Sequence, residues 1–146
     1  MKITNKRAFY DFQILQRLEA GINLKGAEVK AVRGGRADLT GAFVRIIGSE
    51  AYLINAKIFP PAYARPQEYD EDRTRKLLLH KNEIIALKGK MEGANLSLVP
   101  TSMYLTHHLV KLEIALGRGK KQFEKKEAKK KADIARDVEE ELSSNI

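Results

Sequence analysis

The residues from 109 to 116 alternate apolar and polar side chains more regularly than any other part of the chain. Successive side chains of a β-strand point to opposite faces of a sheet, so this period of two predicts a strand with one buried face. Such a strand needs neighbours that cover its apolar side, and it therefore favours a sheet-based fold. The apolar positions are Val110, Leu112, Ile114 and Leu116, and the polar positions between them include Lys111 and Glu113.

Further segments carry a strand signal of the same kind. Residues 8–19 alternate from Tyr10 onward and are rich in aromatic and β-branched side chains, which predicts a strand that is polar on one face. Residues 43–47 and 51–54 flank a glycine-containing loop, which predicts a hairpin. Leu96 begins another strand region. The chain therefore offers five or six short strands.

Two short segments have helical spacing instead. Residues 26–36 place Val29 and Val32 three positions apart, on one helical face, and a Gly-Gly pair follows that can end a helix. Residues 81–88 read as an amphipathic helix with Ile84 directed inward. Both segments are short, so their helicity depends on packing against the rest of the domain.

The order of these elements shows little alternation of strand and helix, which excludes most parallel-sheet folds. Closing a small antiparallel sheet into a barrel hides its edge strands. We therefore predict a mainly β fold, a β-barrel of the oligonucleotide-binding type with short peripheral helices and a flexible basic C-terminal tail. An open α+β sheet is the alternative architecture.

Charge divides the chain into a body and a tail. The 146 residues carry a net charge of +8, and residues 118–131 alone hold eight Lys or Arg against two Glu. We predict a barrel domain over residues 1–117 and, beyond a Gly-Arg-Gly hinge, a basic tail over residues 118–146 that is disordered or marginally helical when free. A cationic tail of this kind favours a polyanionic partner, because phosphate neutralisation is the main electrostatic source of nucleic-acid affinity. A solvated tail without a partner, or one that docks on an anionic membrane, is the alternative.

Several kinds of chemistry lack the residues that they require. The chain contains no cysteine, which excludes disulfides and thiolate metal sites. Adjacent His107 and His108 would point to opposite faces of a strand, and the acidic run 70–72 lacks the spacing of a calcium loop. No Ser-His-Asp arrangement or phosphate-binding glycine motif can be assembled. We therefore expect neither an enzyme nor a metal or cofactor site, although an RNA-processing enzyme using these acids and histidines remains a rival hypothesis.

Basic residues interleaved with aromatic residues remain as the candidate binding surface. RNA-binding barrels use cations for phosphates and aromatic rings for stacking on bases. A general RNA chaperone or ribosomal protein would show the same pattern. The aromatic residues concerned are Tyr10, Phe12 and Tyr104, and the cations we predict to contact RNA are Lys6, Arg7, Lys30, Arg33, Arg36, Arg75, Lys76 and Lys111.

Five sequence blocks in order make the chain resemble a known family. They lie at residues 5–8, 19–22, 26–37, 73–79 and 119–121. Each block alone is weakly specific, but five in order with matching separations are strongly specific. Together they resemble the small protein B family, the SsrA-binding proteins that bind transfer-messenger RNA in bacterial trans-translation. The resemblance implies an oligonucleotide-binding-type barrel, no catalytic activity, and two partners: the tRNA-like domain of transfer-messenger RNA and the stalled ribosome.

The resemblance also implies roles for particular residues. Asn5 and Glu19 would hydrogen-bond bases or ribose, Lys111 would meet phosphate, and Leu78 would pack at the contact. The tail would enter the decoding centre and the empty messenger channel of the ribosome. The ribosome-binding positions in the tail are Arg118, Gly119, Lys120, Lys121, Phe123, Lys125, Lys126, Lys129 and Lys130.

The chain departs from the family pattern at a few positions. Phe123 stands where His or Tyr is common, and its ring cannot hydrogen-bond. Lys126 lacks the planar fork with which Arg binds phosphate. The acidic run 139–141 makes the end of the tail less basic than the family pattern implies. With no signal-peptide pattern and no apolar run long enough for a membrane span, we expect a monomeric cytoplasmic protein.

Overall fold

A seven-stranded antiparallel sheet forms the body of the computed structural model, which describes residues 2–61 and 69–121. The strand order is β1-β8-β4-β5-β7-β2-β9, and β3 and β6 form a separate two-stranded sheet. The strands are β1 (Lys2–Thr4), β2 (Phe12–Ile22), β3 (Ala37–Asp38), β4 (Phe43–Ile47), β5 (Glu50–Ile54), β6 (Lys57–Ile58), β7 (Arg75–Leu78), β8 (Leu96–Thr106) and β9 (Leu109–Gly119). The helices are α1 (Lys6–Asp11), α2 (Gly26–Arg33) and α3 (Lys81–Met91).

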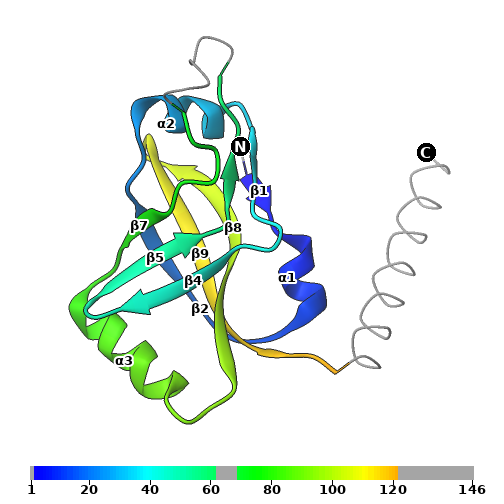
Figure 1. Cartoon of the computed structure of the whole chain (residues 1–146), viewed down its shortest axis with the longest axis vertical. Helices are drawn as coiled ribbons and strands as arrows, with labels where there is room; N and C mark the ends of the chain where they lie inside the picture. Colours follow the sequence, from blue (N-terminus) through cyan, green and yellow to red (C-terminus); the bar gives the residue numbers. More distant parts are fainter. Residues whose placement is uncertain (1, 62–68, 122–146) are drawn as a thin grey trace, which may run out of the picture.

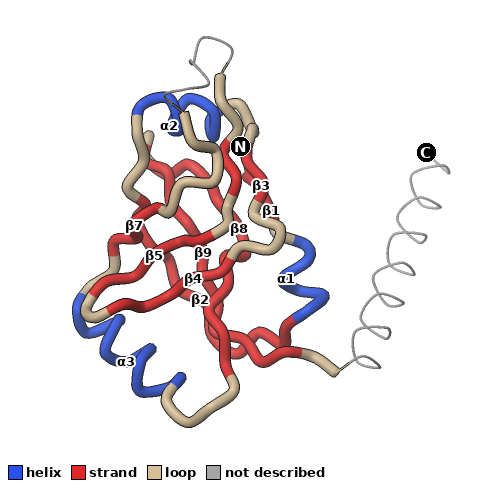
Figure 2. The backbone as a smooth tube through the Cα atoms, viewed as in Figure 1, coloured by secondary structure: helices blue, strands red, loops and turns tan. Residues whose placement is uncertain are grey.

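An additional pairing between β8 and β9 closes the sheet into a ring, which confirms the predicted barrel. Strand β9 pairs with β2 from Phe12 opposite Gly119 to Gly21 opposite Lys111. Its other edge pairs with β8 along almost its whole length. The short helices lie outside this ring of strands, with α2 at one end and α3 beside the tip of the β4–β5 hairpin (Figure 1; Figure 2). The predicted hairpin is thus confirmed.

The interior of the ring holds the apolar core. Leu112 and Ile114 of β9 are fully buried, as their alternation predicts, and they pack with Leu53, Leu77 and Met103 from the neighbouring strands. Ile84 and Leu87 of α3 are buried too, which confirms that this helix is amphipathic. Each such side chain contributes about 1.5–3 kcal/mol when it is removed from water, so the ring closes around its own stabilising core.

Two local expectations are wrong at the start and end of the barrel. Tyr10 lies in helix α1 because the Asn5 side chain caps that helix, accepting a hydrogen bond from the Ala8 backbone, and β2 begins only at Phe12. The expected Gly-Arg-Gly hinge is part of β9. Gly117 is a position of close approach, since a Cβ there would lie 3.0 Å from the Cβ of Phe12.

The chain beyond this strand remains attached to the body at residue 120. The Lys120 backbone N–H donates to the Asp11 carbonyl at 2.8 Å, and the Lys120 ammonium donates to the Phe9 carbonyl at 3.0 Å. The ordered body therefore runs past residue 117, and the predicted tail residues Arg118 and Gly119 are paired with β2.

A buried ionic cluster fastens α2 to the barrel. Glu28 of α2 and Arg75 of β7 are both almost fully buried, and Arg75 Nε donates to Glu28 Oε2 at 2.8 Å. Arg73 donates to the other carboxylate oxygen at 2.5 Å, and the Lys25 backbone N–H donates to it at 2.8 Å. The remaining donors of Arg75 bind the carbonyls of Ala56 and Glu71. Burial opposes ionisation of Glu28, but these hydrogen bonds outweigh it and hold its pKa below the usual value.

Replacing the buried carboxylate of Glu28 should lower the stability of the protein. Glu28→Gln leaves the Arg75 guanidinium buried without a counter-charge, so we expect a loss of about 3–5 kcal/mol in the free energy of unfolding. Since the pKa of Glu28 is depressed in the folded chain, its contribution is complete well above the ordinary value of 4.5 and is lost as the pH falls below it. Urea titrations at several pH values measure both effects.

The matched control is Glu92→Gln, which removes an exposed carboxylate at the end of α3. Exposed substitutions of this kind change stability by less than about 0.5 kcal/mol. Equal midpoints for the two variants would show that the buried cluster does not stabilise the fold.

Candidate nucleic-acid interface

A groove of about 720 Å³ opens on the outer face of the barrel, where β2, β7 and β9 meet the start of α3. It brings together four residues predicted to bind RNA, which come from three separate parts of the sequence. These are Glu19, Lys76, Leu78 and Lys111, and the groove is completed by residues that include Gly21, Ser49, Glu50, His80 and Lys81.

Strand pairing explains why these residues meet. Gly21 of β2 is opposite Leu78 of β7 on one edge and opposite Lys111 of β9 on the other. Gly21 has no side chain, and a Cβ at that position would lie 3.1 Å from the Cβ of Leu78. Leu78 can therefore pack across the strand while the residue stays 56% exposed. A large aliphatic side chain held open in a polar groove is available to contact a base or a ribose.

The carboxylate of Glu19 is held in place by a tyrosine. The hydroxyl of Tyr104, on β8, donates to Glu19 Oε2. Burial of the phenol and this hydrogen bond to Glu19 raise the pKa of Tyr104 to about 12. Tyr104 therefore remains a donor at neutral pH and holds one carboxylate oxygen of Glu19, which is exposed on β2.

The opposite rim carries an exposed ion pair. Lys76 Nζ lies 2.9 Å from Glu50 Oε1, and the Tyr52 hydroxyl donates to the second oxygen of Glu50. The hydrogen bonds from Tyr52 and Lys76 lower the pKa of Glu50, and Glu50 in turn raises the pKa of Lys76. Pairs this exposed contribute little to stability, so Lys76 can exchange Glu50 for a phosphate at small cost.

The structure buries two of the residues predicted to contact RNA, Asn5 and Arg75. The Asn5 amide donates to the carbonyls of Leu39 and Pro100, at 3.2 Å and 2.8 Å, and only 3% of the residue is exposed. Arg75 is fully buried in the ionic cluster with Glu28. Asn5 fastens the start of α1 to β8 and to the loop before β4, and Arg75 fastens β7 to α2.

The other predicted cations lie on separate faces. Lys6 and Arg7 are on α1, where Arg7 pairs with Asp11 at 3.0 Å and its guanidinium lies 5.2 Å from the Tyr10 ring centroid. On and after α2 the exposed cations are Lys30, Arg33 and Arg36. In the tail set, Arg118, Gly119, Lys120 and Lys121 are described, whereas Phe123, Lys125, Lys126, Lys129 and Lys130 lie outside the described residues.

Sequence reasoning did not find the acidic and histidine-containing rim of the groove. In the sequence Glu50 is part of the loop between residues 43–47 and 51–54, and His80 follows an apolar triplet, so neither position carries a signal for a binding site. Glu83 offered a signal for the start of α3, because a Glu three residues after a helix cap often binds the backbone of the capping residue. In the structure its carboxylate accepts a hydrogen bond from the His80 backbone at 2.9 Å, which fixes the start of α3 beside the groove.

Other kinds of site find no support in the part of the chain that the structure describes. Within residues 2–61 and 69–121 there is no group of three or more His, Asp or Glu side chains that could hold a metal ion. His107 and His108 form the two-residue turn between β8 and β9, both with positive φ, as a tight hairpin turn requires. No described helix is both long and apolar enough to cross a membrane.

A small closed barrel with an open groove of cations, an exposed aliphatic residue and an oriented carboxylate belongs to the class of oligonucleotide-binding barrels. Comparison with known proteins identifies the family within this class. The family model described as SmpB protein matches residues 2–144. The chain therefore belongs to the SmpB family.

Similar proteins agree with this assignment. An SsrA-binding protein of Persephonella marina is 44% identical over 143 residues, covering 98% of this chain and 94% of the relative. That of Sulfurihydrogenibium sp. (strain YO3AOP1) is 45% identical with the same coverage. A solved structure described as "tmRNA-SmpB: a journey to the center of the bacterial ribosome" is 43% identical, with a TM-score of 0.70 over 87% of this chain and 93% of that one. The predicted family and fold are thus confirmed.

The contact between Glu19 and Tyr104 can be tested by titration. Glu19→Gln removes the negative charge beside the phenol, so the pKa of Tyr104 should fall from about 12 toward its usual value of 10. Because the pKa of Tyr104 is raised in the folded chain, its protonated phenol stabilises the fold fully below pH 10, and this contribution is lost as the pH rises toward 12. Phenolate absorbance, taken as the difference between each protein and its Tyr104→Phe variant, isolates this residue. Coinciding curves with and without Glu19 would contradict the contact.

Proposed function

We propose that this protein binds the tRNA-like domain of transfer-messenger RNA and delivers it to stalled ribosomes, for rescue and tagging of incomplete polypeptides. The observation that carries the proposal is the convergence of Glu19, Leu78 and Lys111 in one groove. The names of the relatives support the RNA partner, and the ribosome-related description of the similar structure supports the second partner. The protein acts as a non-catalytic, monomeric binding factor in the cytoplasm.

Each residue of the groove has a distinct task in this proposal. Lys111 and Lys76 neutralise phosphates, and Leu78 packs against the apolar face of a base or ribose. Glu19 repels phosphate and accepts hydrogen bonds, so it favours amino groups of bases and 2′-hydroxyls. A carboxylate in a basic groove therefore selects orientation and register, while the cations supply affinity.

The basic tail has a separate task. Residues 118–131 carry most of its positive charge, and Lys120, within this run, is hydrogen-bonded to Asp11 of α1. Along β2 this contact is at the Phe12 end, whereas Gly21 and the groove are at the other end. RNA held in the groove therefore leaves the exit of the tail uncovered, and the tail can contact ribosomal RNA and the empty messenger channel.

Removing one groove cation should weaken RNA binding and its dependence on salt. We expect Lys111→Met to lower the affinity for the tRNA-like domain about tenfold, or about 1.4 kcal/mol. The slope of log affinity against log salt should become shallower by the amount that one phosphate contact contributes, about 0.7–0.9. Gel-shift titrations at several salt concentrations measure both. Lys88→Met is the matched control, since it removes an equal charge from α3 outside the groove. Equal losses of RNA affinity in the two variants would refute the assignment of this groove to RNA.

A truncation that leaves strand β9 intact separates RNA binding by the barrel from the function of the tail on the ribosome. Truncation after Lys121 keeps β9 and its contact with α1. The removed residues 122–146 carry six basic and seven acidic side chains, so the net charge barely changes. We expect RNA affinity to stay within about threefold, a difference under 1 kcal/mol, while tagging on stalled ribosomes is lost. Normal tagging by the truncated chain would refute the task assigned to the tail.

A further inference from the structure

The groove proposed to bind RNA is electrically balanced, although the whole chain carries a net charge of +8. Its lining includes as many carboxylates as ammonium groups: Glu19, Glu50, Glu83, Lys76, Lys81 and Lys111. Carboxylates repel phosphates, so a site that gained all its affinity from charge would not hold them. Glu83 is engaged in capping α3. Glu19 and Glu50 are therefore the carboxylates whose presence in the groove needs a functional reason.

These two carboxylates lie on either side of strand β7. In the sheet β7 is placed between β5, which carries Glu50, and β2, which carries Glu19. On β7 itself, Lys76 and Leu78 are two positions apart and therefore point to the same face. The cation and the exposed aliphatic side chain of the groove thus have a carboxylate on each side.

Each carboxylate is also held by a tyrosine hydroxyl. Tyr104 donates to Glu19, and Tyr52 donates to Glu50. Tyr52 follows Glu50 by two positions on β5, so their side chains share a face, and Tyr52 is the cross-strand partner of Lys76. This register brings Lys76 Nζ to 2.9 Å from Glu50 Oε1. One oxygen of Glu50 is therefore bound by Lys76 and the other by Tyr52.

A phosphate that binds Lys76 displaces only one of these two hydrogen bonds. Glu50 then stays beside the phosphate, because Tyr52 still holds its second oxygen. The two negative charges repel each other unless the RNA offers a donor to the released oxygen, such as a 2′-hydroxyl or a base amino group. Repulsion of the wrong partner is one of the two ways in which a binding site gains specificity.

We propose that Glu50 is a specificity-determining residue of the groove, which acts against RNAs that offer phosphates alone. In the free protein it neutralises Lys76. In the complex with a matching RNA it accepts a hydrogen bond from a 2′-hydroxyl or base amino group beside the bound phosphate, and Tyr52 positions it to do so. This role of Glu50 rests on the proposed function of the groove, and it adds a second selecting carboxylate to Glu19.

Binding titrations of the full-length chain with two RNAs test this role. The tRNA-like domain of transfer-messenger RNA is the matching RNA, and an unrelated hairpin of equal length is the competitor. We expect Glu50→Gln to tighten binding of the hairpin about fivefold and to steepen its salt slope by about 0.7–0.9, because Lys76 becomes free for one phosphate. Affinity for the tRNA-like domain should change less, since the freed lysine is offset by the loss of a charged acceptor. An unchanged ratio of the two affinities would overturn the proposal.

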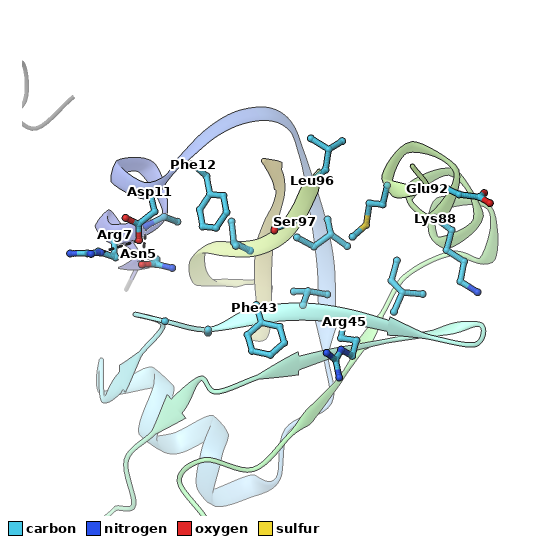
Figure 3. A pocket seen from close by; sticks show the side chains of 18 residues that line it. Asn5, Arg7, Asp11, Phe12, Phe43, Arg45, Lys88, Glu92, Leu96 and Ser97 are labelled. Carbon is cyan, nitrogen blue, oxygen red and sulfur yellow. Dashed lines mark hydrogen bonds and ion pairs between the residues drawn. The ribbon is translucent and has the colours of Figure 1, made fainter. Parts of the chain in front are cut away.

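Two further variants separate this role from a change in net charge. Glu92→Gln removes an equal charge from the rim of a second groove, formed by α1, β4, β8 and α3 (Figure 3), and should leave the ratio of affinities as it is. Tyr52→Phe keeps every charge but releases the carboxylate, so it should lower the preference for the tRNA-like domain as Glu50→Gln does. Equal effects of Glu92→Gln and Glu50→Gln, or an unchanged preference in Tyr52→Phe, would contradict the role of Glu50.

The same titrations separate this role from the function on which it rests. A wild-type protein that bound both RNAs equally would refute the proposed function, and the role of Glu50 with it. A wild-type preference that Glu50→Gln leaves intact would overturn the role of Glu50 alone. Because the ion pair of Glu50 with Lys76 is exposed, the substitution should leave the fold intact, and equal unfolding midpoints in urea verify this.

Discussion

Strand β9 is hydrogen-bonded along both edges, and the rest of the molecule depends on that double pairing. One edge joins β2 and the other joins β8, which closes the ring around the core. The same strand carries Lys111 into the groove proposed to bind RNA at one end and brings the chain beside α1 at the other. One strand therefore fixes the separation between the proposed RNA site and the end of the described body at residues 120 and 121. Two partners can then be engaged by one small barrel.

The parts of the fold that could be predicted are those in which one residue pattern has one physical cause. Alternation in β9 reflects one buried face, and the spacing of Ile84 reflects one buried side of α3. The errors arise where tertiary contacts decide. Gly117 looked like a hinge because glycine is flexible, yet it is glycine because the side chain of Phe12 packs against it. Tyr10 alternates with the residues of β2 but lies in a helix that Asn5 caps, and the Asn5 side chain is held in place by the distant carbonyls of Leu39 and Pro100.

The candidate site was likewise predictable only where it did not depend on tertiary contacts. The resemblance of the chain to one family identified Glu19, Leu78 and Lys111. The structure explains why they meet, through the pairing of Gly21 with Leu78 and Lys111, which no periodicity in the sequence reveals. Arg75 and Lys76 are neighbours with the same charge, but one is buried against Glu28 and the other is exposed beside Glu50. The partner of Arg75 is 47 residues away and that of Lys76 is 26 residues away. The local sequence therefore could not distinguish a buried structural cation from a cation proposed to bind RNA.

The pairing of Phe12 with Gly119 has a consequence for biosynthesis. Strands that are far apart in the chain form slowly, because a long loop must close before any contact is gained. While this protein is being made, β2 and β8 are synthesised before β9 exists, and each has an edge without its final partner. The barrel can be completed only after residue 119 has left the ribosome, so nearly the whole domain must wait, incomplete, for its last strand.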